Sequence, residues 1–302
     1  MRRSRVRSPS TPPTIRQRPA LHGLLLLPFL LLPFDNALAW GQEGHSISAE
    51  IAQRRLTPEA AAMVERLLGR GASLASVASW ADDIRDERPE TYNWHFVDIP
   101  VKRRTYDPRR HCKPAKGGDC VVAELARLRN ELRCAATDEL KKDALRYAVH
   151  FVGDIHQPLH TVADSRGGNL IQVDIEIHEL KCARARNCSK PLVARRNFHA
   201  VWDETLITST TWNWGAYVER LEEGWLKTPA ARGVDGGSAI DWALETHAAA
   251  KEVWNLLPAT RTIDDNYYRD ALPVVDRQLG LAGLRLARFL NEAYSSGQCP
   301  VP

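Results

Sequence analysis

The sequence predicts a mainly α-helical protein with one domain and a small β-strand or β-hairpin segment. Apolar residues recur at helical spacing through most of the chain beyond residue 39. Several of these stretches begin at a Ser or Thr that can act as an N-cap. Clear apolar–polar alternation occurs in one place, residues 170–177, and predicts a half-buried strand there.

The helices can be placed from their start and stop signals. Thr57 followed by Pro58 marks the start of one helix, and Gly69 is expected to end it. Ser73 opens a second helix, which is predicted to reach Arg85. Further helical patterns cover 119–133, 137–157, 197–207, 214–226, 238–257 and 267–294. The segments 98–118 and 180–196 are long and basic, and are expected to be either mobile flaps or solvated loops.

The first 39 residues have the pattern of a secretory signal peptide. Six arginines precede the apolar run Leu24–Phe34, and Ala37-Leu38-Ala39 is a small-x-small pattern that signal peptidase cuts. The apolar stretch contains prolines and is shorter than the ~20 residues that span a bilayer. We therefore expect residues 1–39 to be removed, Trp40 to begin a single domain of residues 40–302, and no stable membrane association.

Net charge and cysteine content narrow the class of protein. The leader holds six of the 41 basic residues and one of the 37 acidic residues, so the mature chain has a net charge of about −1. The mature chain therefore lacks the overall positive charge that is typical of proteins that bind nucleic acid over a broad surface. Any attraction for anions must come from a local site. All six cysteines lie in the mature part, which fits a secreted or periplasmic protein.

The cysteine spacing favours two local disulfides without fixing the connectivity. Cys112 and Cys120 bracket one short loop, and Cys182 and Cys188 bracket another, which leaves Cys134 and Cys299. No pair has the Cys-x-x-Cys spacing of a zinc site. Asn187 begins a glycosylation sequon, which matters only in a eukaryotic secretory pathway.

Histidines and aspartates recur at the spacing of metal ligands. His150 and Asp154 lie four residues apart on one predicted helix and so share a face, and His199 and Asp203 repeat this spacing. His160 follows the break at Pro158 and can turn back toward the same place. Two further groups are Asp82 with Arg85, and His95 with Phe96 and Asp98. After cleavage, the free amine and carbonyl of Trp40 could chelate a metal together with the imidazole of His45.

Each group also has a simpler explanation. A single His–Asp pair at this spacing is more often a surface hydrogen bond or a helix cap than a metal site. His95 between two aromatic residues fits a buried core histidine, and Asp82 fits a surface acid. The presence of all these groups in one chain favours a metal centre.

The order of these groups resembles the secreted trinuclear-zinc nucleases, which include the fungal single-strand-specific nucleases of the S1/P1 type and the plant bifunctional nucleases. The resemblance runs from Trp40-Gly-Gln-Glu-Gly-His45 to His199-Ala-Val-Trp-Asp203, and the block from His150 to His160 is very specific. It implies the mainly helical fold shared by zinc-dependent phospholipase C and single-strand nucleases, with zinc ions at the bottom of a cleft.

The resemblance also implies a role for individual residues. One zinc ion would be held by Asp82, His95, His150 and Asp154, a second by Trp40, His45 and Asp154, and a third by His160, His199 and Asp203. Asp82 and Arg85 would act on the water and the phosphate, Phe96 would stack on a base, and Asp98 would hydrogen-bond the base edge. His156 matches no ligand and is expected behind the ligands or at the surface. His111, His178 and His247 match none either.

The activity implied is hydrolysis of single-stranded DNA and RNA to 5′-phosphorylated products, with 3′-nucleotidase activity, by a monomer. Two alternatives stay open: a zinc-dependent phospholipase C that acts on phospholipids, and a non-catalytic zinc-binding protein. Phe96 and Asp98 favour the nuclease, while Asp82 and Arg85 together argue against a non-catalytic protein. The basic 98–118 loop and the Cys182–Cys188 insert depart from the fungal pattern, so the substrate range is left open.

Overall fold

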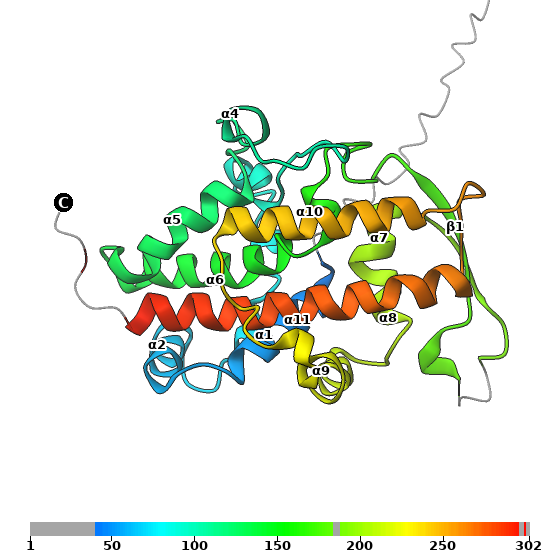
Figure 1. Cartoon of the computed structure of the whole chain (residues 1–302). Coiled ribbons are helices and arrows are strands. Elements are labelled where there is room, and N and C mark those ends of the chain that lie inside the picture. The colour runs from blue at the N-terminus through cyan, green and yellow to red at the C-terminus, as the bar shows by residue number, and fades with distance from the viewer. Residues whose placement is uncertain (1–39, 184–187, 296–298, 300–302) are drawn as a thin grey trace, which may run out of the picture. The chain divides into compact units, whose positions relative to one another are not determined.

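Helices dominate the computed structural model, which describes residues 40–183, 188–295 and 299 (Figure 1). The predicted leader and Asn187 lie outside the described residues. The mainly α-helical fold class is confirmed. The longer helices are α1 (Gln42–Gln53), α2 (Pro58–Leu68), α5 (Val121–Cys134), α6 (Asp138–Asp154), α9 (Trp214–Glu223), α10 (Ala239–Leu256) and α11 (Asp265–Ser295).

Shorter helical turns connect these elements and carry much of the site. The α-helical turns are α3 (Trp80–Asp83), α4 (Pro108–His111), α7 (Phe198–Ala200) and α8 (Leu206–Thr208). The 3-10 turns are η1 (Leu74–Val77), η2 (Pro89–His95), η3 (Pro158–Thr161), η4 (Leu180–Cys182), η6 (Trp225–Lys227) and η7 (Pro229–Ala231). One π-helical turn, η5 (Val201–Thr205), lies between α7 and α8.

Local capping explains most of the helix starts that the sequence predicts. Thr57 accepts a hydrogen bond from the Ala60 amide, and Thr137 accepts one from the Leu140 amide. Ser238 and Asp241 form a reciprocal capping box at the start of α10. Gly69 ends α2 with φ +96°, a conformation that side chains disfavour. These helix starts and stops are confirmed.

The continuous helix predicted from Ser73 to Arg85 is wrong. The segment forms η1 and α3, two short pieces separated by Ala78 and Ser79. In an unbroken helix the Ala78 carbonyl would accept from the Asp82 amide, but that amide bonds Ser79 instead. The Ala78 carbonyl accepts a hydrogen bond from His150 Nδ1 at 2.7 Å. The break in the helix therefore leaves the Ala78 carbonyl free to accept from the imidazole of His150.

Helix α1 was not predicted from the sequence. Its N-cap, Gly41, makes no side-chain capping bond, and the helix carries polar residues that are buried rather than exposed. His45, Ser46 and Ser48 all lie inside the protein, so the usual apolar stripe is interrupted. Helix α1 packs along α11, where a Cβ on Gly283 would lie 2.4 Å from Ile51 Cγ2.

A three-stranded sheet accompanies the helices, in the order β2-β1-β3. The predicted strand is the central one, β1 (Gln172–Ile177), and its residues alternate between exposed and buried. Strand β2 (Leu192–Asn197) pairs with it antiparallel and β3 (Thr262–Asp264) parallel. The loop prediction for 180–196 is therefore wrong in its last five residues. Strand β2 is an edge strand with little burial, so it lacks the alternation that marks β1.

Two apolar clusters hold the domain together. One lies among α2, α5, α6 and the C-terminal half of α11, and the other among α8, α9, the sheet and the N-terminal half of α11. Helix α1 contributes residues to both. The disulfides Cys112–Cys120, Cys134–Cys299 and Cys182–Cys188 confirm the pairing that the spacing favoured. Among the described helices, none combines the length and apolar character needed to cross a bilayer.

Candidate metal centre and active site

The predicted ligands come from distant parts of the sequence and meet in the fold. His45 is on α1, Asp82 on α3, His95 on η2, and His150 and Asp154 on α6. His160, His199 and Asp203 follow on η3, α7 and η5. All eight side chains are at most 7% exposed. They form three groups in which the donor atoms lie within 4.8 Å of one another: His45, His150 and Asp154; Asp82, His95 and His150; His160, His199 and Asp203.

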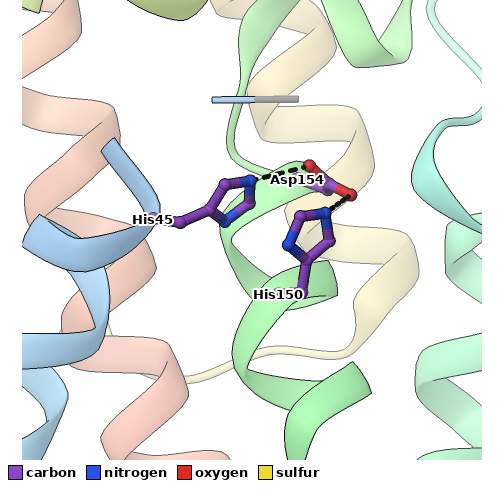
Figure 2. A group of neighbouring side chains, drawn as sticks. All are labelled: His45, His150 and Asp154. Atoms are coloured by element: carbon purple, nitrogen blue, oxygen red, sulfur yellow. Dashed lines mark ion pairs between the residues drawn. The ribbon is translucent and has the colours of Figure 1, made fainter. Parts of the chain in front are cut away.

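Asp154 belongs to the first group and also lies close to the histidines of the second. Its Oδ1 is 3.4 Å from His45 Nε2, and its Oδ2 is 3.2 Å from His150 Nε2 (Figure 2). Oδ2 also lies 3.0 Å from His95 Nδ1. The two oxygens of one carboxylate thus face different histidines, which is the arrangement needed to bridge two cations.

Asp82 completes the group that contains His95 and His150. Its Oδ1 lies 3.5 Å from His95 Nδ1 and 3.6 Å from His150 Nε2. The Arg85 Nη1 lies 3.7 Å from the same oxygen. The Asp82 carboxylate thus faces the histidines on one side and Arg85 on the other. It can ligate a cation at the donor group and can also hold Arg85 where the guanidinium meets a bound anion.

The third group is arranged around two stacked imidazoles. The rings of His160 and His199 have centroids 5.0 Å apart, and His199 Nε2 lies 3.4 Å from Asp203 Oδ2. The Gly41 amide donates to the Asp203 carbonyl at 2.9 Å. This hydrogen bond places the chain next to Trp40 beside the third group, and the Trp40 side chain itself is fully buried.

The donor atoms fit a set of bound cations. The buried atoms without a hydrogen-bond partner among the described residues include His45 Nε2, Asp82 Oδ1, Asp154 Oδ1 and Asp203 Oδ2. Leaving such an atom unpaired costs about 1–3 kcal/mol. A cation at each group would use these lone pairs, and a nitrogen and oxygen donor set suits zinc.

Backbone carbonyls fix which nitrogen of His150 and which nitrogen of His199 faces the centre. His150 Nδ1 donates to the Ala78 carbonyl and His199 Nδ1 donates to the Gly167 carbonyl, both at 2.7 Å. The Nε2 lone pair of each ring is then directed toward its group. Hydrogen bonds of this kind hold the tautomer and the ring plane that a metal requires.

The charges of the centre are strongly coupled. Burial, together with the neighbouring His150, lowers the pKa of His45 to about 4. Burial opposes the charged form of His150, but Asp154 and Asp82 outweigh it and raise the pKa of His150 to about 9. Burial likewise opposes the charge of Asp154, yet His150 and His160 hold its pKa well below the usual range. Because metal ligands must be deprotonated, cation binding at this centre competes with proton binding.

Three residues that the sequence did not single out as functional support the ligands. Gln157 Nε2 donates to Asp203 Oδ1, while its Oε1 accepts from the Leu159 amide. A Cβ on Gly153 would lie 2.6 Å from His45 Nδ1, so only glycine lets α1 approach α6 here. Gly167 has φ +61° and supplies the carbonyl that holds His199. Gly153 and Gln157 lie within three residues of Asp154 in the chain, and Gly167 begins the tight Gly167-Gly168-Asn169 turn that follows His160, so these positions could be found from the sequence.

His156 is a buried structural residue. The sequence left open whether it lies behind the ligands or at the surface, and the surface position is wrong. Its Nδ1 donates to the Val152 carbonyl, and Arg285 donates to its Nε2 at 3.0 Å. Burial and the Arg285 charge lower its pKa to about 3. His156 therefore ties the end of α6 to α11. None of the three metal-ligand groups found among the described residues includes His111, His178 or His247.

The residues predicted to contact substrate lie beside the Asp82 group. The Arg85 guanidinium carbon lies 5.2 Å from the centre of the Tyr92 ring, and Tyr92 meets Phe96 edge to face at 6.0 Å. Phe96 is half-buried and Asp98 is exposed. An arginine and two aromatic rings therefore adjoin the Asp82 group, and the exposed Asp98 follows two residues after Phe96.

A helical domain with three adjoining His/Asp groups has the architecture of a multinuclear metalloenzyme. The sequence model of the S1/P1 Nuclease family matches residues 40–295, so this chain belongs to that family. The resemblance and the class of reaction predicted from the sequence, hydrolysis of phosphodiester bonds by a nuclease, are both confirmed.

Curated relatives agree with the family over nearly their full length. The chain is 29% identical to Endonuclease 2 of Arabidopsis thaliana, over 90% of this chain and 96% of the relative. It is 30% identical to Endonuclease 4 of the same plant, over 87% and 91% of the two chains. Identity to Nuclease P1 of Penicillium citrinum is 29%, over 85% and 98%.

Proposed function

We propose that this protein is a secreted or periplasmic zinc-dependent endonuclease. It hydrolyses single-stranded DNA and RNA to 5′-phosphorylated products and removes phosphate from 3′-nucleotides. The observation that carries the proposal is the meeting of three donor groups around Asp154 in a member of the S1/P1 nuclease family. Printed names of relatives, such as Nuclease P1 and Endonuclease 2, support a nucleic-acid substrate over a phospholipid.

Three zinc ions account for the donor groups. We assign the first to Asp82, His95, His150 and Asp154, and the third to His160, His199 and Asp203. The second is assigned to His45, Asp154 and the amine and carbonyl of Trp40 after removal of residues 1–39. The unpaired buried atoms of His45, Asp82, Asp154 and Asp203 support this assignment.

The chemistry needs a nucleophile and stabilisation of charge on phosphorus. Bound zinc acts as a Lewis acid toward phosphate oxygens and lowers the pKa of water toward ~7. Asp82 accepts a hydrogen bond from the attacking water and orients it. Arg85, held by Asp82 and packed on Tyr92, donates to phosphoryl oxygens as their charge increases.

The neighbouring residues select the substrate. Phe96 offers a face on which a base can stack, and every base has such a face, so stacking tolerates different sequences. Asp98 lies exposed two residues further on and accepts a hydrogen bond from a base edge. An unpaired base reaches this platform more easily than a base in a duplex, which accounts for a preference for single strands.

Secretion is supported by chemistry at both ends of the chain. The leader pattern ends at Ala39, and three disulfides tie loops and the C-terminal segment to the domain. Disulfides persist in oxidising compartments such as the periplasm or the extracellular space. We propose that the mature protein acts there as a monomer.

The proposal is tested by zinc content and activity of the protein that starts at Trp40. We expect three zinc ions per chain by elemental mass spectrometry. We also expect release of 5′-nucleotides from single-stranded DNA and RNA, and of phosphate from a 3′-nucleotide, all lost with EDTA. Three ions with hydrolysis of phosphatidylcholine alone would overturn the nuclease and favour a phospholipase. Fewer than three ions would overturn the ligand assignment.

A further inference from the structure

The rim loop, residues 98–118, differs sharply in charge from the rest of the domain. Between Lys102 and Lys116 it carries seven basic residues and one acidic residue, in a mature chain with a net charge of about −1. The single acid, Asp107, pairs with Arg110. Six exposed cations remain, and none forms an ion pair with any described residue: Lys102, Arg103, Arg104, Arg109, Lys113 and Lys116. We call these the rim cations.

The C-terminal end of the rim loop is hydrogen-bonded to the segment that carries His95 and Phe96, and its N-terminal end follows that segment directly in the chain. The Val121 amide donates to the Phe96 carbonyl at 3.0 Å, and Asn93 Nδ2 donates to the Gly118 carbonyl at 2.9 Å. At the other end, the Val101 amide donates to Asp164 at 2.6 Å. The Cys112–Cys120 disulfide closes the second half of the loop. The two ends of the loop that carries the rim cations are therefore anchored close to Phe96 in the chain and in the fold.

Tyr92 connects the platform to the rim loop. It is 53% exposed although it is a large aromatic residue, and it contacts both Phe96 and Arg85. Gly117 packs against it, since a Cβ on Gly117 would lie 3.3 Å from Tyr92 Cβ. Aromatic faces thus continue from Phe96 toward the rim cations. Exposed aromatics next to unpaired cations are the two components of a surface that binds single-stranded nucleic acid.

We propose that Tyr92 and the rim cations extend the binding surface, so that the enzyme holds a single strand beyond the nucleotide at the scissile bond. The inference rests on the proposed function and adds to it a preference for polynucleotides over mononucleotides. Tyr92 stacks on a second base, and the rim cations contact successive phosphates. Helix α4, in the middle of the rim loop, lies at the outer edge of the helical body, where a strand can run along it (Figure 1).

The test compares two variants with the same change in charge. The rim variant combines Arg103→Gln, Arg104→Gln and Arg109→Gln. The control variant combines Arg70→Gln, Lys227→Gln and Arg232→Gln, three exposed cations outside the rim loop. Affinity is measured by fluorescence anisotropy with a nuclease-resistant phosphorothioate oligonucleotide on the order of ten nucleotides long, at several salt concentrations. Circular dichroism checks that both variants fold.

We expect the rim variant alone to bind the oligonucleotide more weakly. The slope of log affinity against log salt should fall by about 0.7 for each lost phosphate contact, hence by up to about 2. In turnover, KM for the oligonucleotide should rise while kcat is retained, and hydrolysis of a 3′-mononucleotide should change far less. Tyr92→Ala should weaken oligonucleotide binding, and Tyr92→Phe should restore it.

Two results would overturn the inference. One is equal binding and equal salt slopes for the rim and control variants. The other is an equal loss on the mononucleotide and the oligonucleotide, which would indicate a general effect on the site. A failure of the proposed function looks different, because the unmodified protein would then hydrolyse no nucleic acid or nucleotide even with zinc bound.

Discussion

The floor of the site, by which we mean the eight His and Asp side chains of the three donor groups, differs from the rim loop in burial and in charge. The floor gathers histidines and carboxylates that are nearly or fully buried, and it holds them with hydrogen bonds from behind, such as His150 to the Ala78 carbonyl. The rim cations are exposed to water and form no ion pair with the residues that the structure describes. Buried donors leave little freedom in how a cation binds, whereas exposed cations attract a strand without fixing its sequence. Chemistry is therefore expected to depend on the floor, and substrate length on the rim.

Removing a ligand from the floor should give the largest effect. His150→Ala deletes a nitrogen that two donor groups share, one with His45 and Asp154 and the other with Asp82 and His95. We expect loss of bound zinc and at least about a 100-fold loss of activity, measured by elemental analysis and initial rates. His178→Ala, at a histidine outside the three groups, is the control. Full zinc content in His150→Ala would contradict the assignment.

Blocking the amine of Trp40 tests the assignment of the second zinc ion without changing any side chain. One Gly placed before Trp40 converts the amine into an amide, whose nitrogen has no lone pair for a metal. We expect one zinc ion fewer per chain and about a 10–100-fold loss of activity. One Gly added after Pro302 is the matched control. Unchanged zinc content in the N-terminal extension would rule out Trp40 as a ligand.

Gln157→Met tests whether a residue behind the ligands positions the third group. The substitution keeps side-chain volume but removes the hydrogen bonds to Asp203 and to the Leu159 amide. We expect about a 10–100-fold weaker third ion, seen in zinc titration, and a stability loss of about 1–3 kcal/mol. Gln172→Met, at an exposed position of β1, should change neither. An unaltered zinc titration would show that Asp203 holds its position without Gln157.

Phe96 lies between the metal ligands and the rim loop, and Phe96→Ala should reduce activity less than the loss of a ligand does. Loss of one stacked base costs about 1–3 kcal/mol, which corresponds to roughly a 5- to 150-fold rise in KM. Zinc content should stay at three ions because Phe96 is not a ligand. Phe96→Tyr retains an aromatic face and should stay close to the unmodified enzyme. Loss of zinc in Phe96→Ala would show that Phe96 supports the metal ligands and would contradict a role in substrate binding alone.

Single substitutions of the rim cations should give the smallest effects of all. Each removes about one phosphate contact and changes the salt slope by about 0.7. A single rim substitution as damaging as His150→Ala would break the division between floor and rim.

Much of the site could be predicted from the sequence because several of its residues are close together in the chain. His150 with Asp154 and His199 with Asp203 lie one helical turn apart, so helix geometry alone places each pair on one face. Helix caps such as Thr57 and Ser238 are local for the same reason. Helix α1 and strand β2 were missed because one buries polar residues and the other buries little, so neither shows the periodicity of its class.

The sequence by itself determined which residue types are available as ligands, most helix boundaries and the contrast between a neutral domain and a basic loop. Tertiary structure decided which of these residues meet. Only packing brings His45 of α1 within 3.4 Å of Asp154, and it does so because Gly153 leaves room for the imidazole. Only packing sets Tyr92 between Arg85, Phe96 and Gly117. Spacing along one helix follows from its repeat, whereas distances between elements depend on side chains far apart in the chain.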